Sequence, residues 1–226
     1  MRTLIVAATS VEIAPLIAQL RYSAERGPRV KAYTHAGHDV DVLVAGVGMV
    51  ATAAWTCRIL AQTSYDLVLN IGVCGSFDAA VRPATVVHVV SDCIAELGAE
   101  DDGGFLTAQE LGLLADDDVP FTGGRLVNPA PPRNATLNAL PAVAGITVNT
   151  VHGNERSIAD VTRRFRPQVE SMEGAGFMYA CLIHGVVFAQ IRAVSNVIET
   201  RNRAAWKITE AIASLTSTTS NVLDHA

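Results

Sequence analysis

Two glutamates and an asparagine stand where this chain could best do chemistry. Glu12 follows a short apolar run, Glu173 opens a segment that is apolar for ten residues, and Asn196 ends an apolar strand. The surroundings of Glu173 predict partial burial, and a buried carboxylate needs hydrogen-bond donors. A vicinal diol offers two O–H donors at a spacing that one carboxylate can accept, so a ribose is an attractive ligand. We therefore expect residues 169–203 to form the centre of a ligand site.

Other patterns have simpler readings. A glutamate in the first turn of a helix, such as Glu12, is favoured by the macrodipole whether or not it has a function. The glycines in GVG and GVCG also suit tight turns. Neither sequence matches GxGxxG or GxxxxGK[ST], so nucleotide-phosphate binding is poorly supported. Cys74 and Ser76 have no activating base nearby in the sequence, which argues against covalent catalysis.

Composition narrows the function further. The 226 residues carry a net charge of −5, with 50% hydrophobic and 17% charged residues, which fits one domain spanning 1–226. Binding to nucleic acid or to an anionic membrane would require surplus Lys and Arg, so a small-molecule partner fits better. The four scattered cysteines predict free thiols rather than disulfides, and we expect no metal and no cofactor. The N-terminus lacks the features of a secretory signal, so a cytoplasmic location is expected.

Strands alternate with helices along the chain. Apolar runs predict strands at 3–8, 31–36, 40–45, 66–71, 84–91 and 146–151 and again after Gly185, which divides the uncharged stretch 174–191 into a helix and a strand. Helices are expected from Ser10 as N-cap, at 49–60, up to about 164, after Glu173 and at 204–223. Residues 96–141, acidic and proline-rich, are expected to form surface loops or a lid. The order predicts an α/β fold of three layers, α/β/α, around a mixed, mainly parallel sheet.

In such a sheet, ligands bind outside the carboxyl ends of the strands. The polar residues at these ends are expected to line one pocket. They are Ser10 and Glu12, Gly46 to Gly48, Gly72 to Phe77, Met172 and Glu173, and Ser195 and Asn196.

Several of these segments together match a known pattern. AATSVE, GVG, NIGVCGS, VESMEG and RAVSN resemble the purine nucleoside phosphorylase and nucleosidase superfamily over nearly the whole chain. Within it, VESMEGAGF and SNVIETRNRAAW are most similar to the futalosine hydrolases, which release hypoxanthine from the nucleoside futalosine in menaquinone biosynthesis. The resemblance implies a homo-oligomer, a dimer or higher, in which a neighbouring subunit can complete the pocket.

The resemblance also implies roles for single residues. Glu12 matches the carboxylate that directs and deprotonates the attacking water, Met172 packs on the sugar, and Glu173 accepts from its 2′- and 3′-hydroxyls. Ser76, with Gly75 and Phe77, neighbours ribose and base. Arg201 and Arg203 are candidates for the distal carboxylate of futalosine, although contacts with a helix end, between loops or with another subunit are the favoured explanation of these arginines. His152 and Arg156 are weaker candidates for that distal pocket.

Asn196 departs from the related methylthioadenosine/adenosylhomocysteine nucleosidases, which have an aspartate there. An asparagine amide can donate to O6 and accept from a protonated N7, which suits a 6-oxopurine. Aspartate suits a 6-aminopurine. The source of the N7 proton is not given by the sequence.

Three alternatives stay open. An adenine-directed methylthioadenosine/adenosylhomocysteine or aminodeoxyfutalosine nucleosidase is opposed chiefly by Asn196. Phosphorolysis would need an arginine-bearing glycine loop where ATSVEIAP has a glutamate. A nucleoside-binding protein without turnover would not need both Glu12 and Glu173.

Overall fold

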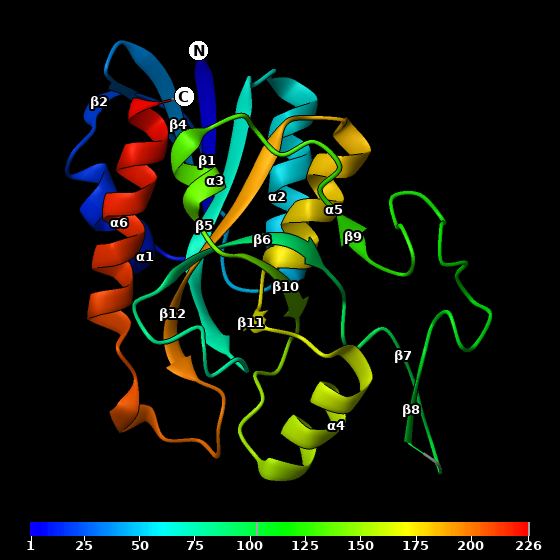
Figure 1. The fold of residues 1–226 in the computed structure, drawn as a ribbon. Coiled ribbons are helices and arrows are strands. Elements are labelled where there is room, and N and C mark those ends of the chain that lie inside the picture. The colour runs from blue at the N-terminus through cyan, green and yellow to red at the C-terminus, as the bar shows by residue number, and fades with distance from the viewer. Residues whose placement is uncertain (103, 226) are drawn as a thin grey trace.

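A mixed sheet of ten strands runs through the middle of the molecule (Figure 1). The structure is a computed structural model and describes residues 1–102 and 104–225. Within these, the strands are β1 Arg2–Ala7, β2 Arg21–Gly27, β3 Val30–His35, β4 His38–Val44, β5 Leu67–Ser76, β6 Val86–Asp92, β7 Gly98–Asp101, β8 Gly104–Thr107, β9 Leu126–Val127, β10 Ala142–Thr147, β11 Val169–Ser171 and β12 Phe188–Val197. The α-helices are α1 Ser10–Ile17, α2 Met49–Gln62, α3 Ala135–Ala139, α4 Glu155–Phe165, α5 Gly174–His184 and α6 Ile208–Asp224, and a 3₁₀ turn spans Arg203–Ala205.

The strand order is β11-β10-β6-β12-β5-β1-β4-β3-β2, with β9 beside β6 and with β7 and β8 forming a separate hairpin. Strand β5 lies at the centre, parallel to both β1 and β12. Strand β3 lies between β2 and β4 and is antiparallel to both, and β11 pairs antiparallel with the end of β5. The expected mixed sheet of an α/β fold is thereby confirmed.

Helices cover both faces of the sheet, as Figure 1 shows: α1 and α6 lie on one side, and α2 and α5 on the other. Successive residues of a strand point to opposite faces. In β1, Ile5 and Ala7 accordingly join the core under α1 and α6, whereas Leu4 and Val6 join the core under α2 and α5. Because β1 is buried on both faces, its sequence is a continuous apolar run rather than an alternating one.

Two glycines bring α5 close to its neighbours. A Cβ on Gly176 would collide with the backbone of Met49 in α2, and one on Gly174 would collide with Asp92 and Gln190. The helix ends at Gly185, whose φ of 62° is left-handed. The uncharged stretch 174–191 is thus a helix and a strand, as expected. Among the described helices, none combines the length and apolar character needed to span a bilayer.

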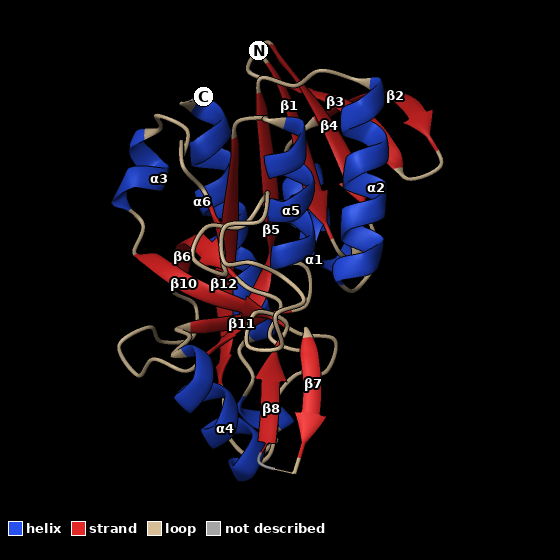
Figure 2. Ribbon diagram, turned by 90° about the vertical axis from the view of Figure 1, so that its right-hand side faces the viewer, coloured by secondary structure: helices blue, strands red, loops and turns tan. Residues whose placement is uncertain are grey.

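Three expectations need correction. The segment GVCGS is strand rather than loop, because β5 continues through Ser76 with β12 and β11 as partners. The strand expected at 146–151 lies at 142–147. Residues 96–141, where no element was placed, hold the β7–β8 hairpin beside α4 (Figure 2), β9 and α3.

Candidate active site

The loop after β1 and the first turn of α1 position Glu12. Thr9 is the N-cap, so Ser10, expected in that role, is instead the first helical residue. Glu12 Oε2 accepts from the Thr9 backbone N–H (3.0 Å) and from the Thr9 hydroxyl (2.8 Å), forming a capping box. Glu12 Oε1 accepts from the Val73 backbone N–H in β5 at 3.2 Å. Three donors hold this buried carboxylate in one orientation at the end of the central strand.

Glu173 occupies the N-cap position of α5 and is also buried. Its Oε1 accepts from the backbone N–H of Gly48 at 3.1 Å. Gly48 has a φ of 97°, a conformation that residues with a Cβ rarely adopt, so the glycine in GVG serves this contact. The other carboxylate oxygen, Oε2, lies 3.9 Å from Nη1 of Arg192.

Arg192 was missed at the sequence level, although a charged residue inside the apolar run FAQIRAV is a signal in itself. Its side chain is completely buried (0% exposed). Nη2 donates to Asn70 Oδ1 at 2.5 Å, and Asn70 in turn donates to the Val6 carbonyl at 2.9 Å. Nε and Nη1 have no hydrogen-bond partner among the described residues.

Gly72 is the point where these groups converge. It pairs with Arg192 in the β5–β12 register. A Cβ on Gly72 would collide with Arg192 Nη1 and would lie 2.9 Å from Glu12 Oε1. The missing side chain leaves room over Gly72 for the Arg192 guanidinium and for Glu12 Oε1, and Glu173 Oε2 lies 3.9 Å from the same Nη1. Two carboxylates therefore flank one buried cation that has a free donor.

Asp92, at the end of β6, lies behind the N-terminus of α5. Its Oδ1 accepts from the Cys93 backbone N–H (2.8 Å) and the Thr147 hydroxyl (3.0 Å), while Gln190 Nε2 donates to Oδ2 (3.2 Å). Thr147 Oγ1 also accepts from the first-turn N–H of Ala175 at 2.7 Å. Burial raises the pKa of the Asp92 carboxyl to about 6, against the opposing effects of these hydrogen bonds and of the Arg192 charge.

Asn196 marks the other end of the candidate site. A bulge in β12 between Val194 and Asn196 brings Asn196 opposite Gly75 in β5. The Ser195 hydroxyl lies 2.8 Å from Asn196 Oδ1, and Asn196 Nδ2 donates to the Val197 carbonyl at 3.0 Å. These contacts assign the amide orientation and leave one N–H and one oxygen lone pair for a ligand. A Cβ on Gly75 would lie only 2.7 Å from Ile198 Cγ1, so this position needs its glycine.

The remaining candidates differ in what they offer. The Ser76 hydroxyl is completely buried and is used within its own turn, donating to the Asp78 carbonyl at 2.9 Å. Met172 and Phe77 are partly exposed. Arg201 is exposed and stacks its guanidinium on Trp206, with Cζ 5.6 Å from the ring centroid, while its backbone N–H donates to Gly153. Glu12 and Glu173 thus lie near Arg192. Asn196, in β12, lies beside Gly75, three residues further along β5 than Gly72. Arg201 lies over Trp206 instead.

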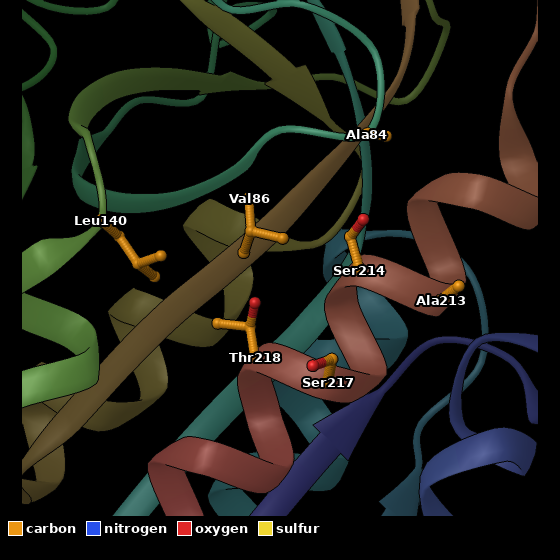
Figure 3. Close-up of a pocket in the computed structure, with 7 residues that line it drawn as sticks. All are labelled: Ala84, Val86, Leu140, Ala213, Ser214, Ser217 and Thr218. Atoms are coloured by element: carbon orange, nitrogen blue, oxygen red, sulfur yellow. The ribbon is translucent and has the colours of Figure 1, made fainter.

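Hollows in the surface also lie outside this cluster of Glu12, Glu173 and Arg192. One, of about 550 Å³, is lined along α6 by small polar and apolar side chains and holds no titratable group (Figure 3). Another, of about 970 Å³, lies between the β7–β8 hairpin and α4 and includes His152 and Arg156. Among the residues that the structure describes, no group of three or more His, Cys, Asp or Glu side chains could hold a metal ion. The four cysteines are free thiols.

Comparison with known proteins identifies the class. The profile of the Phosphorylase superfamily matches residues 2–226. A futalosine hydrolase of Streptomyces coelicolor is 36% identical over 184 residues, covering 78% of this chain and 75% of its own, and one of Acidothermus cellulolyticus is 34% identical over 216 residues, covering 93% and 86%. A methylthioadenosine/adenosylhomocysteine nucleosidase of Colwellia psychrerythraea, solved with adenine, superposes with a TM-score of 0.80 at 20% identity over 100% of this chain and 95% of its own.

This chain therefore belongs to the phosphorylase superfamily. Within that superfamily it is an enzyme, an N-glycosyl hydrolase.

Proposed function

We propose that this enzyme hydrolyses the N-glycosidic bond of futalosine, releasing hypoxanthine and dehypoxanthine futalosine in menaquinone biosynthesis. The observation that carries the proposal is the convergence of Glu12 and Glu173 on the buried Arg192. Two relatives above 30% identity, both named futalosine hydrolase, support the same substrate.

The cluster suits hydrolysis because it supplies one group for water and one for the sugar. Glu12, fixed by Thr9 and Val73, retains acceptor capacity on the Oε1 that faces Gly72. It orients a water molecule and takes its proton as the water attacks the anomeric carbon. The unpartnered Nη1 of Arg192 donates to the same water. Glu173 Oε2, 3.9 Å from that nitrogen, accepts from the ribose hydroxyls.

Asn196 acts at the base. As the glycosidic C–N bond breaks, its electron pair enters the purine, and the amide N–H of Asn196 donates to O6. The amide oxygen accepts the hydrogen carried by N7. Solvent water supplies that proton, because an amide does not release one at neutral pH. In a 6-aminopurine the 6-amino group is a hydrogen-bond donor, so it would face the N–H donor of Asn196 without an acceptor between them.

Release of the base tests the proposal directly. The purified enzyme is incubated with futalosine, inosine and methylthioadenosine, each with and without phosphate, and the products are identified by chromatography. Hypoxanthine from futalosine at a rate independent of phosphate is expected. Adenine release from methylthioadenosine with an inert futalosine would establish the adenine-directed alternative and refute ours.

The role of Glu12 is tested by Glu12→Gln. The amide keeps the shape but cannot take a proton, so kcat should fall by about 10²- to 10⁴-fold. Hypoxanthine binding, measured by calorimetry, should stay within about twofold because Glu12 does not contact the base. Glu25→Gln on the exposed strand β2 is the matched control. A Glu12→Gln enzyme of near-normal rate would remove Glu12 from the mechanism.

A further inference from the structure

We propose that Glu170, held in place by His152, accepts the N1–H of a 6-oxopurine base. Asn196 would then share the choice of base with a second residue. The inference rests on the proposed nucleoside hydrolysis and assigns a group that this mechanism has not used.

Glu170 is a buried carboxylate with spare acceptor capacity. Its side chain is 2% exposed. One oxygen accepts from the His152 backbone N–H at 2.9 Å, and the other makes a short contact with His152 Nδ1. An ionised carboxylate offers about four acceptor positions, so about two remain open. No further partner of this carboxylate is found in residues 1–102 and 104–225.

The position of Glu170 connects it to the base end of the site. In β11 it pairs with Gly75, and Gly75 pairs on its other side with Asn196 in β12. Glu170 and Asn196 therefore flank the same glycine from the two strands that border the end of β5. Gly75 carries no side chain, and Ile198 and the Asn196 amide pack against the space that its Cβ would take.

His152 closes this region and orients Glu170. It holds the carboxylate through both a backbone and a ring nitrogen, so the carboxylate plane is fixed. Its ring packs edge-on against Phe77, with centroids 6.4 Å apart. The next residue, Gly153, accepts from the backbone N–H of Arg201. Loops from three parts of the chain thus meet beside Gly75, and His152 acts as a positioning residue.

The chemistry of the base explains why a carboxylate would be useful there. Hypoxanthine presents an acceptor at O6 and a donor at N1–H, side by side on its six-membered ring. Asn196 can satisfy O6 and N7, which leaves N1–H in need of an acceptor. Adenine has a bare lone pair at N1, which the acceptor oxygens of Glu170 would repel. A mismatched buried partner of this kind changes selectivity by about 10- to 100-fold.

The experiment compares three leaving groups in the wild type and in Glu170→Gln. These are hypoxanthine (futalosine and inosine), adenine (methylthioadenosine), and nitrophenol (nitrophenyl riboside), which has no N1. In the variant, the ratio of kcat/KM for 6-oxopurine over 6-aminopurine substrates should fall at least about 10-fold, because the new amide can donate to N1 of adenine. Hydrolysis of nitrophenyl riboside should stay within about twofold, since the sugar and water groups are intact.

Two further variants test the positioning role of His152 and provide a control. His152→Phe should lower the same ratio in the same direction while sparing nitrophenyl riboside. Glu199→Gln, on an exposed loop residue close to Asn196, should leave the ratio unchanged. An equal loss on all three leaving groups in Glu170→Gln would show a merely structural role and overturn the proposal, as would an unchanged ratio.

A binding measurement separates this inference from the proposed function. Calorimetry with hypoxanthine and adenine should show that Glu170→Gln weakens hypoxanthine binding by at least about 10-fold relative to adenine. Wild-type enzyme that releases no hypoxanthine from any substrate would refute the proposed function. Equal effects of Glu170→Gln on the binding of the two bases would refute the role of Glu170.

Discussion

Replacing Asp92 with asparagine should remove a pH-dependent component of stability. The Asp92 side chain is fully buried, and its pKa is raised from 3.8 to about 6, chiefly because burial disfavours the charged carboxylate. One pKa unit corresponds to about 1.4 kcal/mol, so a shift of this size amounts to about 3 kcal/mol of unfolding free energy. That is a sizeable part of the total for a domain, about 5–15 kcal/mol.

The sign follows from proton binding. Between pH 4 and pH 6 the carboxyl is protonated in the folded protein and ionised in the unfolded chain, so the folded state binds more protons. The contribution of Asp92 is therefore fully present below about pH 4 and is lost as the pH rises through about 6. Asparagine does not titrate and can keep the contacts to Cys93 and Thr147. It can also donate to Gln190 Oε1, which is now buried without a partner.

The assay is urea unfolding of wild type and Asp92→Asn from pH 4 to pH 8. Relative to the wild type, the variant should gain about 3 kcal/mol over this range, and groups common to both proteins cancel in the difference. Asp39→Asn, at an exposed position, is the matched control and should give a much flatter difference. A difference between wild type and Asp92→Asn that is flat from pH 5 to pH 8, or that slopes the other way, would refute the reasoning.

Three predictions concern the site itself. Asn196→Asp should move the ratio of kcat/KM toward 6-aminopurine nucleosides by about 10-fold or more, and unchanged selectivity in a substrate-competition assay would contradict base reading by Asn196. Arg192→Met should lower kcat/KM by at least about 100-fold, since Asn70 Oδ1 loses its buried donor and Glu173 loses its neighbouring cation; a fully active variant would exclude Arg192 from the cluster. Gly75→Ala should reduce activity through its clash with Ile198, and Gly75→Ala combined with Ile198→Ala should recover part of it in a double-mutant cycle.

The sequence predicted the polar ends of the strands well. Glu12 and Asn196 stand at the ends of apolar runs, which mark buried strands whose carboxyl ends meet at one edge of the sheet, and Glu173 opens the apolar helix α5. The end of α5 at Gly185 was predicted for the same kind of reason, because glycine is the residue best suited to a left-handed cap. These features depend on local chemistry, which a single chain displays directly.

Features that depend on packing between distant segments were not predicted. Arg192 is visible in the sequence as a charge in an apolar strand, but its contacts with Asn70 and Glu173 arise only when β5, β12 and α5 come together. The glycines in GVCGS suggest a turn when only neighbouring residues are considered. Gly72 is instead part of a strand, where its missing side chain makes room for the Arg192 guanidinium. Strand β2 was not predicted, because it is almost entirely exposed and its sequence lacks the alternation of apolar and polar residues that indicates a half-buried strand.

Strand β5 continues without a break through Ser76, so a single strand sets the distance between the two parts of the proposed substrate site. In the proposed mechanism the water and the sugar lie near Gly72 and the base lies near Gly75, and three residues of extended chain separate these glycines by about 10 Å. Hydrogen bonds to β12 along this stretch keep that spacing rigid. Because backbone alone joins the two positions, we expect that exchanges at Asn196 would change which base is accepted without displacing Glu12 or Arg192.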